Sequence, residues 1–398
     1  MSWIKLKNLL LFTISIALSL LIAEVGIRFV RPMITYSELT KLIGSYYAPD
    51  QNNTFTIKKN YQGYESTMDG RGLAIVTTNS EGFRSTREAN AISSNILIIG
   101  DSYTFGVYVN DDETYPSIIE QTLNVPEKFR VINAGYTSGH ETDQQYSWFQ
   151  RNFSKIKPKI VVWGVFLGND IFGISPQYWS EKNSEGLPVK YINPNIYVDS
   201  FGRIRAKEFN PLNTVNTQTY YKIPVLRELH LWIAANRVLD RVKRVFETDD
   251  GKEISKGGYI ASNWNHIYGE YSDEFLQKED IFLKLLNSAN QICEENGCKF
   301  VVALHPINFM VQANLMNKVI PNNEFFGLEP TYYQRLGAKL KDMDIKYIDI
   351  HKNMIASPGT YFPKNGEVHY DSNGNKFAGE LIANYLLKEF PSILKSEN

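Results

Sequence analysis

The chain has 398 residues, of which 42 are Lys or Arg and 43 are Asp or Glu, so its formal net charge is −1 at pH 7. A hydrophobic content of 43% predicts a folded globular protein, and the balanced charge disfavours nucleic acid as a partner. Two cysteines in a chain of this length exclude a disulfide scaffold and a cysteine-rich metal site. One large domain with additions to it is therefore expected.

The N-terminus predicts a membrane segment. Residues Leu9 to Ala23 carry no charge, and the stretch from Asn8 to Ile27 is long enough to span a bilayer as a helix. No small-residue cleavage site follows it. We predict that residues 1–34 form an uncleaved signal anchor, with a cleaved signal peptide and a buried core helix as alternatives. Positive charges flank both ends and leave the orientation open. We expect the large domain to be periplasmic or extracellular, because nothing in it needs a cytosolic cofactor.

Residues 35–90 are polar and mixed in character, and they predict a hairpin-like segment that leads into the main domain. In this stretch β-branched residues run into Ser80-Glu81-Gly82, which is a turn signal. The main domain is predicted over residues 91–395. Its regular pattern is interrupted at about 171–275, where Pro, Asn, Tyr and Trp are frequent and one helix is indicated around Val225 to Val245. We predict an inserted cap region there.

The main domain is predicted to be an α/β structure with a parallel sheet. Amphipathic helical patterns separate short, continuous apolar runs, and such strands are typical of a parallel sheet that helices cover on both faces. A proline at position 116 predicts the start of one of the helices. The predicted strands are Ile96–Ile99, Arg130–Ile132, Ile160–Trp163, Phe300–Leu304 and Tyr347–Ile348.

A serine directly follows the first predicted strand, in the sequence Gly100-Asp101-Ser102. In open parallel sheets, ligands bind beyond the carboxyl ends of the strands. Ser102 could therefore be a nucleophile, a helix cap or a hydroxyl in a phosphate loop. The segment is not a Walker A loop, because no Gly-Lys-Ser/Thr follows, and it is not a G-x-S-x-G elbow, because Thr104 stands where glycine would be.

Three further segments lie next to predicted strands or helices in the same way. With the first, the four segments are Gly100-Asp101-Ser102, Asn133-Ala134-Gly135, Gly168-Asn169-Asp170 and Val368-His369-Tyr370. Together they resemble the four sequence blocks of the SGNH (GDSL-type) hydrolases, in the branch whose catalytic domain follows an N-terminal membrane segment. The resemblance implies a three-layer, flavodoxin-like sheet and serine-dependent ester chemistry. It also implies that Ser102 is the nucleophile and His369 the base, and that the N–H groups of Ser102 and Gly135 and the Asn169 amide form the oxyanion hole.

These residue types suit the chemistry. A serine alcohol needs a neighbouring base to become nucleophilic, and imidazole can take its proton and return it to the leaving group. Fixed donors must then stabilise the oxyanion. We expect glycine at position 135 because a side chain there would crowd the approaching substrate.

The third member of the triad departs from the family pattern. The family places an Asp two or three residues before the base, whereas this chain has Glu367 and Gly366 there. Glu367 could orient His369 through one extra methylene, or a backbone carbonyl could take that role. A rival pair, Asp349 and His351, has the preferred spacing but lacks the downstream glycine and helix.

Other polar residues receive less specific interpretations. His140 and His305 could line the cleft, although hydrogen-bonded structural roles are the simpler reading. The acidic run Asn110–Glu113 is too short for a calcium loop and predicts a solvated turn. Cys293 and Cys298 are more simply two thiols than a disulfide. We predict no metal and no cofactor.

The predicted function is a membrane-anchored, serine-dependent ester hydrolase of the SGNH type. Its expected substrate is an acyl group, acetyl as the first choice, on an envelope or extracellular carbohydrate. Three alternatives stay open at this point: an O-acetyltransferase that acts on polysaccharide, an esterase for lipids or small esters, and a non-catalytic envelope binding protein on a degenerate site.

Overall fold

A computed structural model describes residues 3–33, 35–38, 44–66, 73–85, 94–124, 129–137, 140–207, 223–246, 265–311, 330–363 and 368–394. The chain divides into two compact units. The smaller comprises Met1–Ile43, Asp69–Gly72 and Asn210–Asp250, and the larger comprises Gly44–Met68, Leu73–Phe209 and Gly251–Asn398. The predicted insertion is therefore divided, because its helical part groups with the N-terminus and not with its sequence neighbours.

The smaller unit is built on two helices, α1 (Trp3–Val30) and α6 (His230–Phe246). Within α1, the segment Leu6–Val30 is long and apolar enough to cross a membrane, a test that a signal sequence also passes. The Glu24 carboxylate accepts hydrogen bonds from the backbone N–H groups of His230 at 3.1 Å and Leu231 at 2.7 Å. The first N–H groups of a helix have no partner within the helix, so Glu24 of α1 caps α6.

The larger unit contains a five-stranded parallel sheet in the order β13-β12-β7-β5-β6. All five predicted apolar runs are strands of this sheet. Counted along the chain, the strand order is 2-1-3-4-5, which is the flavodoxin-like arrangement and confirms the predicted fold class. The strands are β5 (Ser94–Gly100), β6 (Phe129–Gly135), β7 (Pro158–Phe166), β12 (Lys299–His305) and β13 (Lys346–Asp349).

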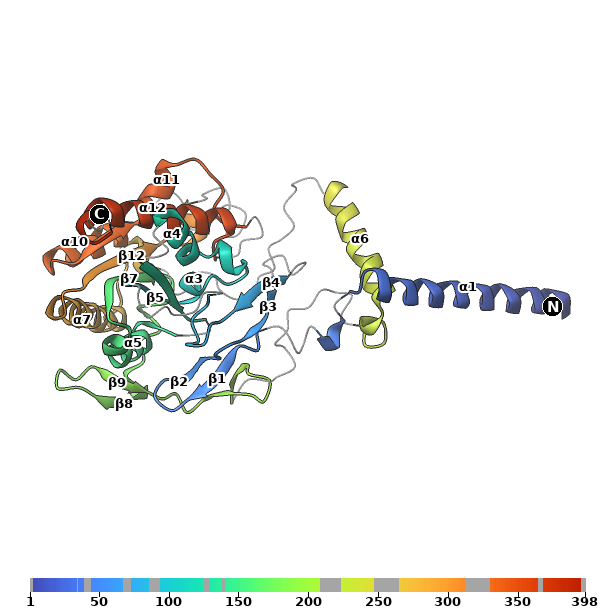
Figure 1. Ribbon diagram of the computed structural model, residues 1–398, viewed down its shortest axis with the longest axis horizontal. Coiled ribbons are helices and arrows are strands. Elements are labelled where there is room, and N and C mark those ends of the chain that lie inside the picture. Colours follow the sequence, from blue (N-terminus) through green and yellow to red (C-terminus); the bar gives the residue numbers. More distant parts are fainter. Residues whose placement is uncertain are drawn as a thin grey trace. The chain divides into compact units, whose positions relative to one another are not determined.

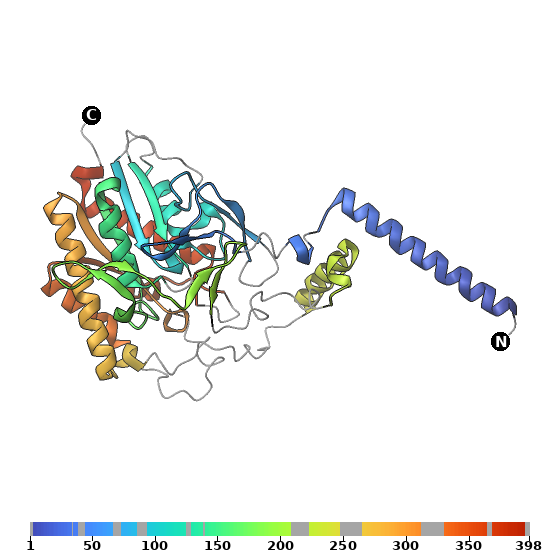
Figure 2. The same ribbon diagram turned by 90° about the horizontal axis from the view of Figure 1, so that it is seen from below.

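Helices cover both faces of the sheet, as Figures 1 and 2 show. In β5, Ile96 and Ile98 are buried in the core of one face, and Leu97 and Ile99 in the core of the other, which explains why the strand reads as a continuous apolar run. The first face packs against α4 (Tyr115–Leu123), α11 (Ile350–Ala356) and α12 (Ser372–Glu389). The second packs against α5 (Thr142–Ile156), α7 (Asp273–Glu295) and α10 (Thr331–Asp342).

Antiparallel hairpins form the additions to this unit. The lead-in segment contains two of them, β1 with β2 and β3 with β4, and the first part of the predicted insertion contains two more. Buried rings of the lead-in pack with Phe105 and Tyr136 in a third core cluster. The remaining elements are β1 (Tyr47–Asp50), β2 (Thr54–Ile57), β3 (Gln62–Ser66), β4 (Leu73–Thr77), β8 (Trp179–Lys182), β9 (Pro188–Tyr191), β10 (Ile196–Val198), β11 (Ile204–Ala206), α3 (Ser102–Phe105), α8 (Asn308–Val311), α13 (Pro391–Leu394) and the 3₁₀ turns η1 (Asp111–Glu113), η2 (Pro176–Tyr178), η5 (Leu226–Glu228) and η6 (Asn265–Tyr268).

Candidate active site

The turn between β5 and α3 places Ser102 at the carboxyl edge of the sheet. A Cβ atom on Gly100 would lie 2.2 Å from the Thr104 hydroxyl oxygen and 2.8 Å from the Gly164 carbonyl oxygen, so the chain can reverse here only with glycine. The Asp101 carboxylate accepts a hydrogen bond from the Tyr103 N–H at 2.9 Å and caps α3. Ser102 is thus the first residue of a short helix beside the point where the strand order reverses.

The structure brings Ser102 and His369 together from positions 267 residues apart, with 2.8 Å between the serine Oγ and the imidazole Nε2. The segment before His369 is held to α3, because the Tyr103 hydroxyl donates a hydrogen bond to the Val368 carbonyl oxygen. The imidazole also packs against the rings of Tyr103, with centroids 5.3 Å apart, and Tyr108, with centroids 5.6 Å apart. Both the backbone and the ring of His369 are therefore oriented toward Ser102.

The rival pair lies elsewhere and has other contacts. The Asp349 carboxylate caps α11 by accepting the Lys352 N–H at 2.8 Å. The His351 ring stacks on Tyr333, with centroids 4.8 Å apart. Glu367, the predicted third member of the triad, lies outside the described residues, so its pairing with His369 stays a prediction.

Asn169 follows β7, and its amide contacts the carboxyl group of Glu141, a residue that the sequence did not predict as part of the site. The Asn169 Nδ2 donates a hydrogen bond to Glu141 Oε2 at 3.1 Å. The same side chain also hydrogen-bonds the Asp101 carboxylate, so a ligand would have to take an N–H from one of these two carboxyl groups. A Cβ atom on Gly173 would lie 2.2 Å from the Glu141 Cγ, so a small residue is required where the two loops meet. In the sequence, Glu141 follows the second segment, Asn133-Ala134-Gly135, and directly precedes α5. An acidic residue at that place is the signal that could have identified it.

Gly135 has a different structural reason from the one predicted. A Cβ atom there would lie 2.2 Å from the backbone N of Phe105, so glycine is required by the close packing of β6 against α3 and not by clearance for a substrate. The Gly135 N–H donates to the Asn133 side-chain oxygen at 3.0 Å. Its predicted role in the oxyanion hole is untested, and it would require this hydrogen bond to be exchanged.

Three buried carboxyl groups, Asp101, Asp143 and Asp170, interact electrostatically with one another or with the half-buried Glu141. Burial, together with the neighbouring Asp101 and Asp143 carboxylates, raises the pKa of Glu141 to about 8. Burial also raises the pKa of Asp101 and of Asp143 to about 6, and it holds the pKa of Asp170 well above its ordinary value. Like charges this close cannot all ionise, and Glu141, with a pKa of about 8, keeps its proton at neutral pH.

The remaining sequence candidates are structural. His305 is fully buried, with 3.2 Å between its Nδ1 and the Tyr370 hydroxyl oxygen, and His140 stacks on Tyr136 at a centroid distance of 3.9 Å. Burial lowers the pKa of each of these two histidines to about 3, which keeps them neutral. Cys293 and Cys298 are free thiols. Among the residues that the structure describes, no group of three or more His, Cys, Asp or Glu could hold a metal ion. The run Asn110–Glu113 forms a capped 3₁₀ turn.

No protein-family model matches the chain, and no curated protein matches it. Solved structures with a similar fold include a protein from Desulfitobacterium hafniense assigned to the G-D-S-L family of lipolytic proteins, with 15% identity, a TM-score of 0.34, and coverage of 73% of this chain and 99% of that one. A lipase/acylhydrolase from Enterococcus faecalis has 12% identity, a TM-score of 0.35, and coverage of 74% and 95%. An acetylxylan esterase from Geobacillus stearothermophilus has 13% identity, a TM-score of 0.35, and coverage of 75% and 96%.

Proposed function

We propose that this chain is a serine-dependent ester hydrolase, with Ser102 as nucleophile and His369 as general base. The observation that carries the proposal is the 2.8 Å contact between the Ser102 Oγ and the His369 Nε2. A nucleophile and a base within hydrogen-bonding distance are the minimum that acyl transfer needs. A non-catalytic binding protein has no requirement for this contact.

The reaction proceeds in two stages. His369 takes the proton of Ser102 as the Oγ attacks the ester carbonyl, and it returns that proton to the leaving alcohol when the tetrahedral intermediate collapses. A water molecule, activated by His369, then attacks the acyl-serine and releases the acid. During each stage an N–H of the Asn169 amide, released from Asp101, and the backbone N–H of Ser102 stabilise the oxyanion. Glu367 orients the imidazole in this proposal.

The proposed substrate is an acyl group, acetyl as the first choice, on an envelope or extracellular carbohydrate. Support comes from the N-terminal helix, which fits an anchor that would hold the site beside the envelope, with the larger unit periplasmic or extracellular. Anchoring raises the local concentration of enzyme next to a large, slowly diffusing substrate.

A fluorophosphonate probe tests the proposal without knowledge of the substrate, because it modifies any activated serine. We expect labelling of the wild-type protein and none of Ser102→Ala. The His369→Ala variant should label at least a hundredfold more slowly, since general-base catalysis contributes about 10²–10⁴ in rate. Equal labelling of the wild type and Ser102→Ala, or no labelling of either, would contradict the assignment.

A further inference from the structure

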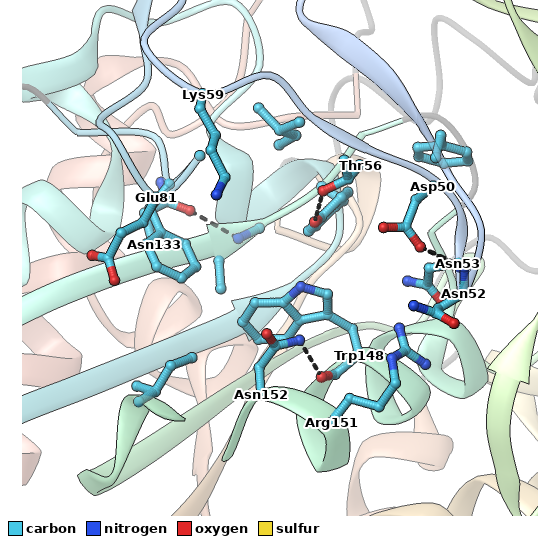
Figure 3. Close-up of a pocket in the computed structure, with 18 of the residues that line it drawn as sticks. Asp50, Asn52, Asn53, Thr56, Lys59, Glu81, Asn133, Trp148, Arg151 and Asn152 are labelled. Atoms are coloured by element: carbon cyan, nitrogen blue, oxygen red, sulfur yellow. Dashed lines mark hydrogen bonds between the residues drawn. The ribbon is translucent and has the colours of Figure 1, made fainter. Parts of the chain in front are cut away.

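A cavity of about 430 Å³ lies along the edge of the central sheet, and neither Ser102 nor His369 lines it. Figure 3 shows this cavity. The hairpin of β1 and β2 forms one wall and α5 forms another. The edge strand β6 contributes the residues at its carboxyl end. Gly135 of β6 pairs in register with Gly100 of β5, two residues before Ser102. The cavity thus begins at the strand beside the candidate active site, and Gly135, a predicted oxyanion-hole residue, lines it.

One face of α5 supplies an aromatic and cationic lining. Trp148, Arg151, Asn152 and Lys155 line the cavity, and their spacing of three, four and seven residues places them on one side of a helix. Trp148 is half-buried and packs edge-to-face on Phe83, with centroids 6.0 Å apart. In Figure 3 its indole lies between the labelled polar side chains.

The indole of Trp148 is suited to a sugar ring. Its N–H has no hydrogen-bond partner within the described part of the chain, although a tryptophan N–H that lies inside a protein usually finds one. The Asn52 side-chain amide, on the opposite wall, likewise makes no hydrogen bond with a described residue, and Asn152 uses only its Nδ2, on the Trp148 carbonyl oxygen. A flat ring with free donors and acceptors around it matches the apolar face and the hydroxyl edge of a pyranose.

The charges of the lining favour an anionic ligand. Lys59 and Lys155 are exposed and form no ion pair with any described residue, whereas Glu81 is bound to an arginine of β6 at 2.8 Å. The Asp50 carboxylate accepts two backbone N–H groups of its own turn. Arg151 donates to the Ser147 hydroxyl and to the Val189 carbonyl oxygen, and it interacts with the Asp50 carboxylate. Among the described residues of the lining, Lys59 and Lys155 are therefore the cations available to a ligand. They come from opposite walls, so they suit carboxylates spaced along a chain better than one converging phosphate site.

We infer that this cavity binds a glycan that carries carboxylate groups, with one sugar ring on Trp148 and the carboxylates on Lys59 and Lys155. A bound uronate-containing chain would extend along β6 toward the candidate active site. The inference concerns binding alone, and it does not require that the chain hydrolyse an ester.

The test uses the full-length chain with Ser102→Ala in detergent micelles, and isothermal titration with hexagalacturonate at low salt. The galactose hexasaccharide without carboxylates is the matched ligand. Lys59→Gln with Lys155→Gln should weaken binding of hexagalacturonate by about three- to tenfold and flatten its salt dependence. Trp148→Ala should weaken it by at least about tenfold, as expected for a central aromatic contact. Lys376→Gln with Lys388→Gln, both exposed on α12, is the control pair and should change nothing.

Several results would overturn the inference. These are no binding of hexagalacturonate by the parent protein, equal binding of the neutral hexasaccharide, or equal effects of the two lysine pairs. Binding of adenosine monophosphate without binding of hexagalacturonate would assign the cavity to a nucleotide instead. Because the lysine variants replace exposed side chains, they remain informative even if Trp148→Ala fails to fold. Esterase activity does not enter any of these measurements, so their outcome is distinct from that of the proposed function.

Discussion

Substitution of Glu141 by glutamine should change the pH dependence of ester turnover above neutral pH. Protonated Glu141 accepts one N–H of Asn169 without placing a charge beside the oxyanion. As the pH rises through about 8, the carboxyl ionises. An oxyanion that takes the other N–H of the same amide in place of Asp101 would then lie about 5 Å from the Glu141 carboxylate. With an effective dielectric constant of about 20, the repulsion is about 3 kcal/mol, or about two orders of magnitude in rate.

The assay is kcat/KM for a short aryl ester between pH 6 and pH 10. The wild type should lose up to about a hundredfold above pH 8, whereas Glu141→Gln should hold its rate there and match the wild type near pH 7, because neutral Glu and Gln offer Asn169 the same carbonyl oxygen. Glu295→Gln, on the exposed end of α7, is the control and should behave as the wild type. An unchanged alkaline limb in Glu141→Gln would refute the reasoning.

Ionisation of Glu141 should also lower the thermal stability of the protein. The folded-state pKa of Glu141, about 8, lies above its ordinary value of 4.5, so the stabilising effect of the bound proton is present at low pH and is lost as the pH rises through about 8. The Tm of the wild type should therefore fall more between pH 5 and pH 8 than that of Glu141→Gln, and parallel Tm curves would contradict the assignment. Ser102→Ala and His369→Ala should each abolish turnover of a short aryl ester with the fold intact, and the double variant should be no worse than either single one, whereas additive losses would speak against a shared mechanism. Glu367→Gln should lower kcat much more than it alters KM, and Asp349→Asn should do little. Reversed results would move the base away from His369. A chain that lacks α1 should keep its activity on small esters but lose amide-exchange protection at the start of α6, because Glu24 no longer accepts those N–H groups. Retained protection would show that the cap is dispensable.

The sheet could be predicted from the sequence because each of its strands is buried on both faces. Such strands are continuous apolar runs, and the helices between them carry regular stripes, so the pattern alone indicates the layers. The association of α6 with α1 could not be predicted in this way. It depends on one carboxylate, Glu24, which reads in the sequence only as a charge at the end of an apolar segment.

The candidate site was predictable to the extent that its residues directly follow strands. Ser102 and Asn169 come after β5 and β7, the two strands that flank the point where the strand order reverses. Glu141 was missed because its partner lies 28 residues away, and the contact depends on how two loops meet at Gly173. The reason for glycine at position 135 was not predicted for a similar reason, since the backbone of α3 fills the space that a substrate was expected to need.

The candidate site consists of two pairs of residues, Ser102 with His369 and Asn169 with Glu141. The two pairs depend on helices that cover opposite faces of the sheet. His369 precedes α12, which packs so closely on α4 that a Cβ atom on Gly379 would lie 2.6 Å from the Ile118 Cβ. The start of α4 is tied to α12, because the Tyr115 N–H donates to the Asn375 side-chain oxygen at 3.1 Å. The nucleophile and base therefore depend on the core between α4, α12 and the sheet.

Asn169 and Glu141 depend instead on the other face. Glu141 immediately precedes α5, whose rings pack in the second core with those of α7 and α10. Substitutions that loosen the first core should lengthen the contact between Ser102 and His369 and slow the modification of serine by a fluorophosphonate. Those that loosen the second should leave the activation of Ser102 intact and weaken the stabilisation of the oxyanion. Because the sheet separates the two cores, their effects on the free energy of activation should add, in contrast to the non-additive pair formed by Ser102 and His369.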